Sequence, residues 1–265
     1  MDIENTMNKL WQSYQVITPS ANRIKKLFES QGELVNNDHI AFRTFNDPKV
    51  NIDKLASAFV DLGYEPKQEY YFEKKKLNAK HYEHADDKLP RIFISELILE
   101  DFSPFLKETI SKVIDSIPAN ALSGNLLFSG RMWDTPSYKI YDQLREESEY
   151  AAWLYLYGFI VNHFTVNINE LKAFDSVEEV NDFLKHNGFK LNSSGGEVKG
   201  RPSDLLQQSS TIADRIKYGF IEGEKEVPGG YYEFAKRYEE NGKLFNGFIT
   251  NSADKIFEST DKSLQ

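Results

Sequence analysis

The chain has 265 residues, a formal net charge of −9 and no cysteine. Its length allows one large or two small domains, and a 40% hydrophobic content supplies a sizeable core. The acidic balance argues against nucleic acid as a partner because phosphate binding needs a basic face. The lack of cysteine excludes disulfides, thiolate nucleophiles and zinc–thiolate sites.

No apolar run approaches the roughly 20 residues that span a bilayer. The first residues also lack the basic and then apolar pattern of a secretory signal. Together with the missing cysteines, these features lead us to expect a cytoplasmic protein without a membrane partner. They leave the oligomeric state open.

The N-terminal third begins with two predicted helices, 2–15 and 20–31, the second with Ser20 as N-cap and Gly32 as its stop. A strand over 38–45 follows. His39 and Arg43 share one face of this strand because side chains alternate. Imidazole is the commonest metal ligand, and arginine is suited to hold a carboxylate at two points. One strand can therefore supply a metal ligand and an anchor for an acidic substrate.

A helix over 51–63 and strands near 64–71, 75–83 and 91–97 complete a β-α-β-β-β order. Residues 103–157 read as mainly helical, with Ser103 as cap and Pro104 in the first turn.

The second half repeats this order, starting with a strand over 158–168 that contains His163. A capping-box pattern at Ser176–Glu179 starts a helix that runs to about residue 187. Further strands are predicted near 189–192, 215–221 and 229–236, with a polar link over 193–211. Both histidines precede a helix–glycine–aromatic unit at nearly equal spacing.

These patterns predict an α+β fold in which paired βαβββ modules form one curved, partly closed sheet, with added helices outside. We expect a single compact unit over 1–265. Its expected parts are a first module at 33–100, a helical insertion at 101–157, a second module at 158–240 and a C-terminal extension at 241–265. The extension is expected to hold a short strand and a short helix.

By strand parity, the concave face of this sheet would collect His39, Arg43, His163 and Glu233. Glu233 lies among aromatic residues, where a carboxylate needs a partner or must give up its charge. Two histidines and one carboxylate from three strands match the facial triad of non-haem iron(II) oxygenases.

Each of these residues also has a structural interpretation. A histidine inside a strand is often a core residue, Arg43 can form an ordinary salt bridge, and Glu233 can pair with Lys236 or Arg237.

Other polar residues carry weaker signals. We expect His81 and His84 to lie in a solvated hairpin, and His186 to favour a helix C-terminus. Glu96 is a candidate second carboxylate of a two-fold symmetric site. The run Ser209–Thr211 can either bind a ligand or cap a strand.

Four segments together resemble the 2-oxoadipate dioxygenase/decarboxylase family of the vicinal oxygen chelate superfamily, over roughly residues 5–260. They are DHIAFRTF at 38–45, GFIVNHFT at 158–165, LQQSST at 206–211 and PGGYYEF at 228–234. The resemblance implies a glyoxalase-like fold of paired βαβββ modules, an Fe(II) cofactor held by His39, His163 and Glu233, and Arg43 as the anchor of a substrate carboxylate.

The implied reaction converts 2-oxoadipate and dioxygen to 2-hydroxyglutarate and carbon dioxide, as in lysine catabolism. A 2-oxo acid would approach the metal beside His39, and Asn162 or Thr165 would steady the ligands. The chain is shorter than the best-known bacterial members, which leaves the exact 2-oxo acid open.

Two other functions fit the same residues. The first is a glyoxalase-like metal-dependent isomerase or lyase with Glu96 as a fourth ligand. The second is a non-catalytic module that binds a small ligand, in which the histidines are structural.

Overall fold

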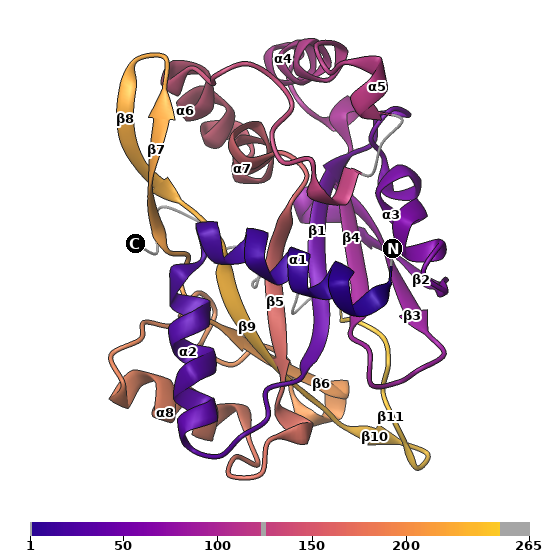
Figure 1. Cartoon of the computed structure of the whole chain (residues 1–265), viewed down its shortest axis with the longest axis vertical. Helices are drawn as coiled ribbons and strands as arrows, with labels where there is room; N and C mark the ends of the chain where they lie inside the picture. The colour runs from indigo at the N-terminus through magenta and orange to yellow at the C-terminus, as the bar shows by residue number, and fades with distance from the viewer. Residues whose placement is uncertain (1, 123–125, 250–265) are drawn as a thin grey trace.

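The computed structural model describes residues 2–122 and 126–249, and its centre is a curled sheet of seven strands in the order β2-β3-β4-β1-β5-β9-β6 (Figure 1). The strands of this sheet are β1 (Asn37–Phe45), β2 (Tyr64–Phe72), β3 (Leu77–His84), β4 (Arg91–Leu97), β5 (Val161–Asn167), β6 (Leu206–Ser210) and β9 (Tyr231–Arg237). The predicted α+β class and the curved sheet are confirmed. No helix within the described ranges is both long enough and apolar enough to cross a membrane.

The first half follows the predicted β-α-β-β-β order, with helix α3 (Ile52–Val60) between β1 and β2. Strand β4 returns parallel to β1, whereas β2, β3 and β4 pair antiparallel in sequence. In this arrangement β1 and β5 lie antiparallel at the centre of the sheet. The two histidine-bearing strands are therefore direct neighbours.

The second half departs from the prediction. Only β5, β6 and β9 join the sheet, while β7 (Arg215–Phe220) and β8 (Gly223–Pro228) form a separate hairpin. The strand expected at 189–192 is wrong, because Leu191 makes only one isolated bridge, to Thr211. The actual strand β6 lies inside the link that we predicted to be a loop. The polar side chains of β6 are typical of a loop, which is why the sequence did not predict a strand. They are nevertheless buried, and Ser209 Oγ donates to Asn181 Oδ1 at 2.6 Å.

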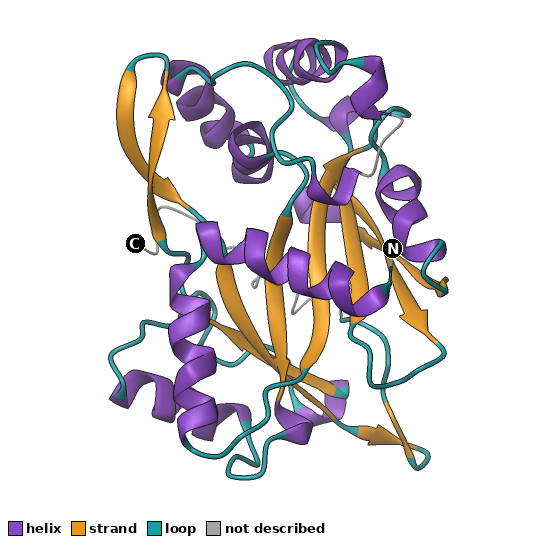
Figure 2. Ribbon diagram, viewed as in Figure 1, coloured by secondary structure: helices purple, strands orange, loops and turns teal. Residues whose placement is uncertain are grey.

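Helices cover the convex face of the sheet (Figure 2), and α3 packs there against β1, β2 and β4. Helices α1 (Ile3–Ile17) and α2 (Pro19–Ser30) pack against β5 and β9, and α8 (Val177–His186) against β6 and β9. The prediction of Ser20 as an N-cap is wrong. The second helix begins one residue earlier, at Pro19, and the Ser20 amide donates to Asp214 Oδ2 instead.

The helical insertion contains α4 (Pro104–Asp115), α5 (Ala119–Leu122), α6 (Tyr138–Glu147) and α7 (Glu149–Tyr157). Ser103, Ser137 and Ser148 cap three of these helices by accepting main-chain amides. The insertion packs at one end of the sheet beside the β7–β8 hairpin (Figure 1). Near the C-terminus, β10 (Glu239–Glu240) pairs with β11 (Lys243–Leu244). The helix expected beyond residue 249 lies outside the described residues.

The strand register decides which carboxylate can reach the histidines. In the parallel pair β5–β9, Thr165 lies beside Glu233, and in the equivalent pair β1–β4, Ala41 lies beside Phe93. The structural counterpart of Glu233 is therefore Phe93. Glu96 has the opposite parity and lies on the convex side, where it accepts the Ile52 amide at 3.0 Å. The two-fold symmetric site with Glu96 as a ligand is thus wrong.

Candidate metal centre

Three strands bring His39, His163 and Glu233 together on the concave face. One ligand atom from each residue lies within 4.8 Å of the other two. The Glu233 carboxylate is 3.5 Å from His39 Nε2 and 3.2 Å from His163 Nε2, and all three side chains are buried. The described residues contain no other cluster of this kind.

His39 is oriented by the residue that precedes it. Asp38 Oδ1 lies 2.7 Å from His39 Nδ1. Because a carboxylate can only accept, Nδ1 carries the proton and Nε2 presents its lone pair to the centre. Burial lowers the pKa of His39, and Asp38 only partly opposes this effect. The imidazole is therefore neutral, which is the form that binds a metal.

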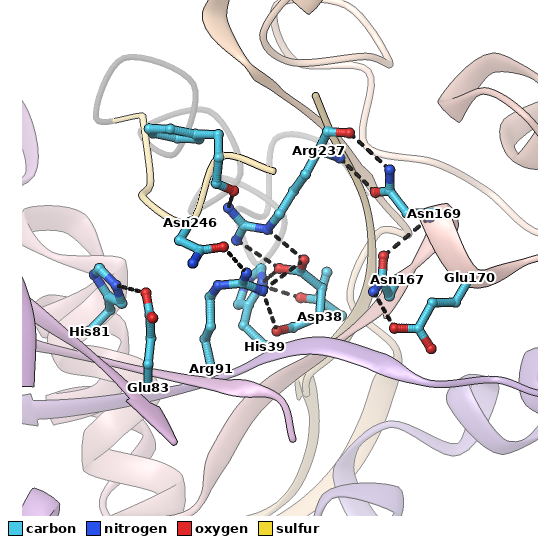
Figure 3. Close-up of polar contacts among 12 residues, drawn as sticks. Asp38, His39, His81, Glu83, Arg91, Asn167, Asn169, Glu170, Arg237 and Asn246 are labelled. Atoms are coloured by element: carbon cyan, nitrogen blue, oxygen red, sulfur yellow. Dashed lines mark hydrogen bonds and ion pairs between the residues drawn. The ribbon is translucent and has the colours of Figure 1, made fainter. Parts of the chain in front are cut away.

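Asp38 is itself held by two arginines (Figure 3). Arg237 donates to both of its carboxylate oxygens, at 2.6 and 2.9 Å, and Arg91 lies 3.4 Å from Oδ2. Burial would raise the pKa of Asp38, but the charge of Arg237 and its hydrogen bonds hold that pKa well below its usual range. Asp38 stays ionised and keeps the His39 ring in one orientation.

His163 repeats the arrangement with a neutral partner, since Asn162 Oδ1 lies 2.9 Å from His163 Nδ1. Burial, followed by the nearby His39 and Arg43, holds the pKa of His163 well below its ordinary value. Its ring stacks on Tyr231, with ring centroids 4.6 Å apart and an interplanar angle of 25°. Both imidazoles therefore direct Nε2 toward the Glu233 carboxylate.

Glu233 is oriented by Gln208 on the neighbouring strand, whose side-chain amide donates to Glu233 Oε1. The other oxygen, Oε2, has no hydrogen-bond partner among the described residues. Burial raises the pKa of Glu233 to about 8, although Gln208 opposes the shift. A buried carboxylate of this kind is costly unless a cation compensates it.

The donor set fits a divalent metal. Two neutral imidazole nitrogens and one carboxylate form a facial set that leaves positions for other ligands, as in non-haem iron(II) sites. A buried carboxylate oxygen without a hydrogen-bond partner among the described residues, beside the Nε2 atoms of two histidines, is what a cation would satisfy. In addition, Thr165 Oγ1 lies 3.1 Å from His39 Nε2.

Arg43 lies on the same concave face and is 1% exposed. Its guanidinium packs over the rings of Tyr150 and Trp153, at 4.8 and 5.3 Å from their centroids. None of its three nitrogens has a hydrogen-bond partner within 2–122 and 126–249, and the nearest acid is Glu149, at 3.8 Å. Arg43 therefore forms one long ion pair, with Glu149, and its guanidinium still offers buried donors without a hydrogen-bond partner among the described residues.

A cavity of about 250 Å³ leads from the surface to Arg43. Lys74, Lys75 and Lys76, in the turn between β2 and β3, line one side of it, and Glu147 and Glu149 line another. Ser103 donates to Glu147 through its amide and its hydroxyl, both at 2.6 Å, so this acid is already engaged. The balance of charge along the cavity favours an anion moving toward Arg43.

The opposite end of the site is covered by the segment after β11. Phe248 packs edge-on against His39, with ring centroids 4.9 Å apart, and also contacts His81. Arg237 holds this segment by donating to the carbonyls of Phe245 and Gly247, at 2.9 and 2.8 Å. These contacts shield His39 from solvent on this side.

Several weaker predictions are now settled by contacts. His81 is buried and bonds to Tyr70 at 2.8 Å, so its assignment to a solvated hairpin is wrong. Strand parity places His81 on the concave face. The charged residues beside it in the sequence had indicated an exposed position. Lys236 and Arg237 bond to Asp175 and Asp38, not to Glu233.

In the run 209–211, Ser209 and Thr211 serve the fold. Thr211 Oγ1 accepts the Tyr232 amide at 3.0 Å, and the Ser209 hydroxyl is taken up by Asn181.

Sequence reasoning missed Asp38, Gln208 and Arg237. One signal was available, because each candidate histidine directly follows an Asp or Asn, in Asp38–His39 and in Asn162–His163. No such signal marks Gln208 or Arg237, whose partners are distant in sequence.

A family model and a curated relative match most of the chain. The family model for 2-oxoadipate dioxygenase/decarboxylase matches residues 4–123 and 125–240. A chloroplastic protein of Arabidopsis thaliana with that name is 38% identical over 250 residues, covering 84% of this chain and 67% of its own.

Solved structures are also similar. A Shewanella frigidimarina protein is 49% identical, with a TM-score of 0.89, covering 94% of this chain and 98% of its own. The hydroxyglutarate synthase of Oryza sativa, solved with 2-oxoadipate, is 36% identical, with a TM-score of 0.91 and coverage of 98% and 92%. A glyoxalase superfamily protein of Ralstonia eutropha, 22% identical with a TM-score of 0.73, shares the fold, covering 90% of this chain and 83% of its own.

The curled seven-stranded sheet and the cluster of His39, His163 and Glu233 define an α+β protein with a candidate metal centre. The chain belongs to the 2-oxoadipate dioxygenase/decarboxylase family, whose named members are enzymes.

Proposed function

We propose that this protein is an Fe(II)-dependent dioxygenase/decarboxylase that converts 2-oxoadipate and dioxygen to 2-hydroxyglutarate and carbon dioxide. The observation that carries the proposal is the meeting of His39, His163 and Glu233 around one point, in a chain of this family. The six carbons of the substrate are recovered as five in the hydroxy acid and one in carbon dioxide, and both oxygen atoms of dioxygen enter the products.

His39, His163 and Glu233 would hold the iron, which when bound supplies the activation of dioxygen. Asp38, Asn162 and Gln208 support the proposal because each fixes the orientation of one of these side chains.

Arg43 would bind the carboxylate of the substrate that is remote from the 2-oxo group. The guanidinium lies on the same strand and face as His39, so a substrate that bridges the two lies along β1. Phe248 and the buried strands keep bulk water away from the reacting end.

The test is metal analysis of the purified protein followed by oxygen uptake in an anaerobically reconstituted sample. We expect one Fe(II) per chain and stoichiometric oxygen uptake with 2-oxoadipate, with 2-hydroxyglutarate detected by mass spectrometry. Oxygen uptake that stays at background with 2-oxoadipate, in a sample with full iron content, would refute the proposal.

A further inference from the structure

Two buried hydrogen-bond donors of the concave face, Arg43 and Tyr231, have no acceptor within the described ranges. The Tyr231 side chain is fully buried. Other buried tyrosines of this protein donate to main-chain carbonyls, as Tyr64 does to Pro90 and Tyr157 to Pro228. The Tyr231 hydroxyl, like that of Tyr232, has no such partner within the described ranges, and burying a hydroxyl without a partner is costly.

The position of Tyr231 is set by the chain on both sides. Gly229 and Gly230 precede it, and the Gly230 amide donates to Ile17 O at 2.9 Å. A Cβ atom on Gly229 would lie 2.1 Å from the same carbonyl oxygen, so only glycine allows this approach. The stack on His163 then fixes the tyrosine ring. The hydroxyl is thus held in place by packing, without a hydrogen bond of its own.

Strand pairing places Arg43 and Tyr231 on the same face of the sheet. Ala41, His163 and Tyr231 lie in one row across β1, β5 and β9, and Arg43 follows Ala41 by two residues on the same face of β1. Burial and then the charge of Glu233 raise the pKa of Tyr231, while the Arg43 guanidinium opposes them. A guanidinium contains only donors, so it offers the hydroxyl proton no acceptor. The Arg43 guanidinium and the Tyr231 hydroxyl would both be satisfied by one group that only accepts hydrogen bonds, and a carboxylate is such a group.

We propose that Tyr231 is a specificity-determining residue whose hydroxyl, together with the Arg43 guanidinium, binds the remote carboxylate of a dicarboxylic 2-oxo acid. This inference rests on the proposed function for the identity of the substrate. Because the Tyr231 ring rests on His163, the carboxylate is held at a set distance from the metal centre, so one chain length of the acid is favoured.

Tyr231→Phe tests the inference, since it removes only the hydroxyl and keeps the stacked ring. Adjacent Tyr232 provides a matched control. Its hydroxyl is also buried without a partner, but its ring faces the other side of the sheet, 5.8 Å from Trp11. Neither hydroxyl has a hydrogen-bond partner within 2–122 and 126–249, so we expect both variants to fold with an unchanged or slightly higher melting temperature.

The readout is binding under argon, measured by calorimetry with 2-oxoadipate and with 2-oxohexanoate, which has the same length but lacks the remote carboxylate. Each titration is done on metal-free and on Fe(II)-loaded protein. We expect Tyr231→Phe to weaken 2-oxoadipate binding by roughly tenfold to a hundredfold and to leave 2-oxohexanoate within twofold. Tyr232→Phe should change neither.

Combination with Arg43→Gln provides a second measurement. If both groups hold one carboxylate, the double variant should lose less than the product of the two single losses. Equal weakening of both acids by Tyr231→Phe, or unchanged binding of 2-oxoadipate, would overturn the inference. Binding that depends on Tyr231 without oxygen uptake would refute the proposed reaction and leave the carboxylate site in place.

Discussion

Arg237 and Asp38, 199 residues apart in sequence, are joined by two buried hydrogen bonds, Nε to Oδ2 at 2.6 Å and Nη2 to Oδ1 at 2.9 Å. The pair joins the end of β9 to the start of β1 directly behind His39. Arg237 also holds the segment that carries Phe248. One ion pair therefore supports both the orientation of a candidate metal ligand and the cover over it (Figure 3).

Replacement of Arg237 by Met should destabilise the protein by about 3–5 kcal/mol, because Asp38 then keeps a buried charge without its main partner. Urea unfolding measures this loss. Lys236→Met is the control, since Lys236 bonds only to the Asp175 carbonyl and is partly exposed. A loss below about 1 kcal/mol for Arg237→Met, or an equal loss in both variants, would contradict this role for the pair.

His163→Ala should abolish stoichiometric metal binding while the protein stays folded. The imidazole supplies one of three protein ligands, and its hydrogen-bond partner at Nδ1 is the neutral amide of Asn162, which the substitution leaves without any unpaired charge. Metal content by mass spectrometry and far-ultraviolet circular dichroism give the two readouts. His186→Ala is the control, since His186 is exposed at the end of α8. Full iron content in His163→Ala would remove this residue from the ligand set.

Arg43→Met should separate function from stability. The variant removes a buried cation whose nitrogens have no hydrogen-bond partner among the described residues, so we expect thermal stability to be unchanged or raised. The Michaelis constant for 2-oxoadipate should rise by roughly a hundredfold, and far less for 2-oxohexanoate. A strong fall in melting temperature would mean that Arg43 mainly supports the fold through Tyr150 and Trp153.

Strand parity explains why the main candidates could be chosen from the sequence. His39, Arg43 and His163 lie on strands with clear apolar neighbours, so their shared face followed from alternation alone. Glu96 shows the limit of this reasoning. Its place in the last strand of the first module suggested symmetry with Glu233, but only the pairing register reveals that Phe93 is the counterpart.

Strand β6 was missed for a different reason. Its Gln and Ser residues are typical of loops, and they are buried only because partners such as Asn181 and Glu233 come from elsewhere in the chain. Local strand propensity does not depend on such distant partners, so it cannot predict the burial of these side chains.

The β7–β8 hairpin is separate from the main sheet, and its turn residue Glu222 caps the N-terminus of α6. We expect this contact to depend on pH. Glu222 accepts from Ser137 Oγ at 2.6 Å and from the Tyr138 amide at 2.7 Å, at the start of α6. These hydrogen bonds, Ser137 first, lower the pKa of Glu222 to about 2. A carboxylate at a helix N-terminus is favoured by the unpaired amides and the helix dipole.

The sign of the effect follows from the lowered pKa. Because the unfolded chain takes up the proton near its ordinary value of about 4.5, the ionised form contributes stability above that pH, and the contribution is lost as the pH falls toward 2. Glu222→Gln should therefore lower the melting temperature at pH 7, and the difference from the unaltered protein should shrink between pH 4.5 and 3. Glu224→Gln, in the same hairpin, changes an exposed acid that lies 3.8 Å from Lys217 and should have little effect at either pH. A difference for Glu222→Gln that persists unchanged at pH 3 would show that the carboxylate charge is not what holds the hairpin to α6.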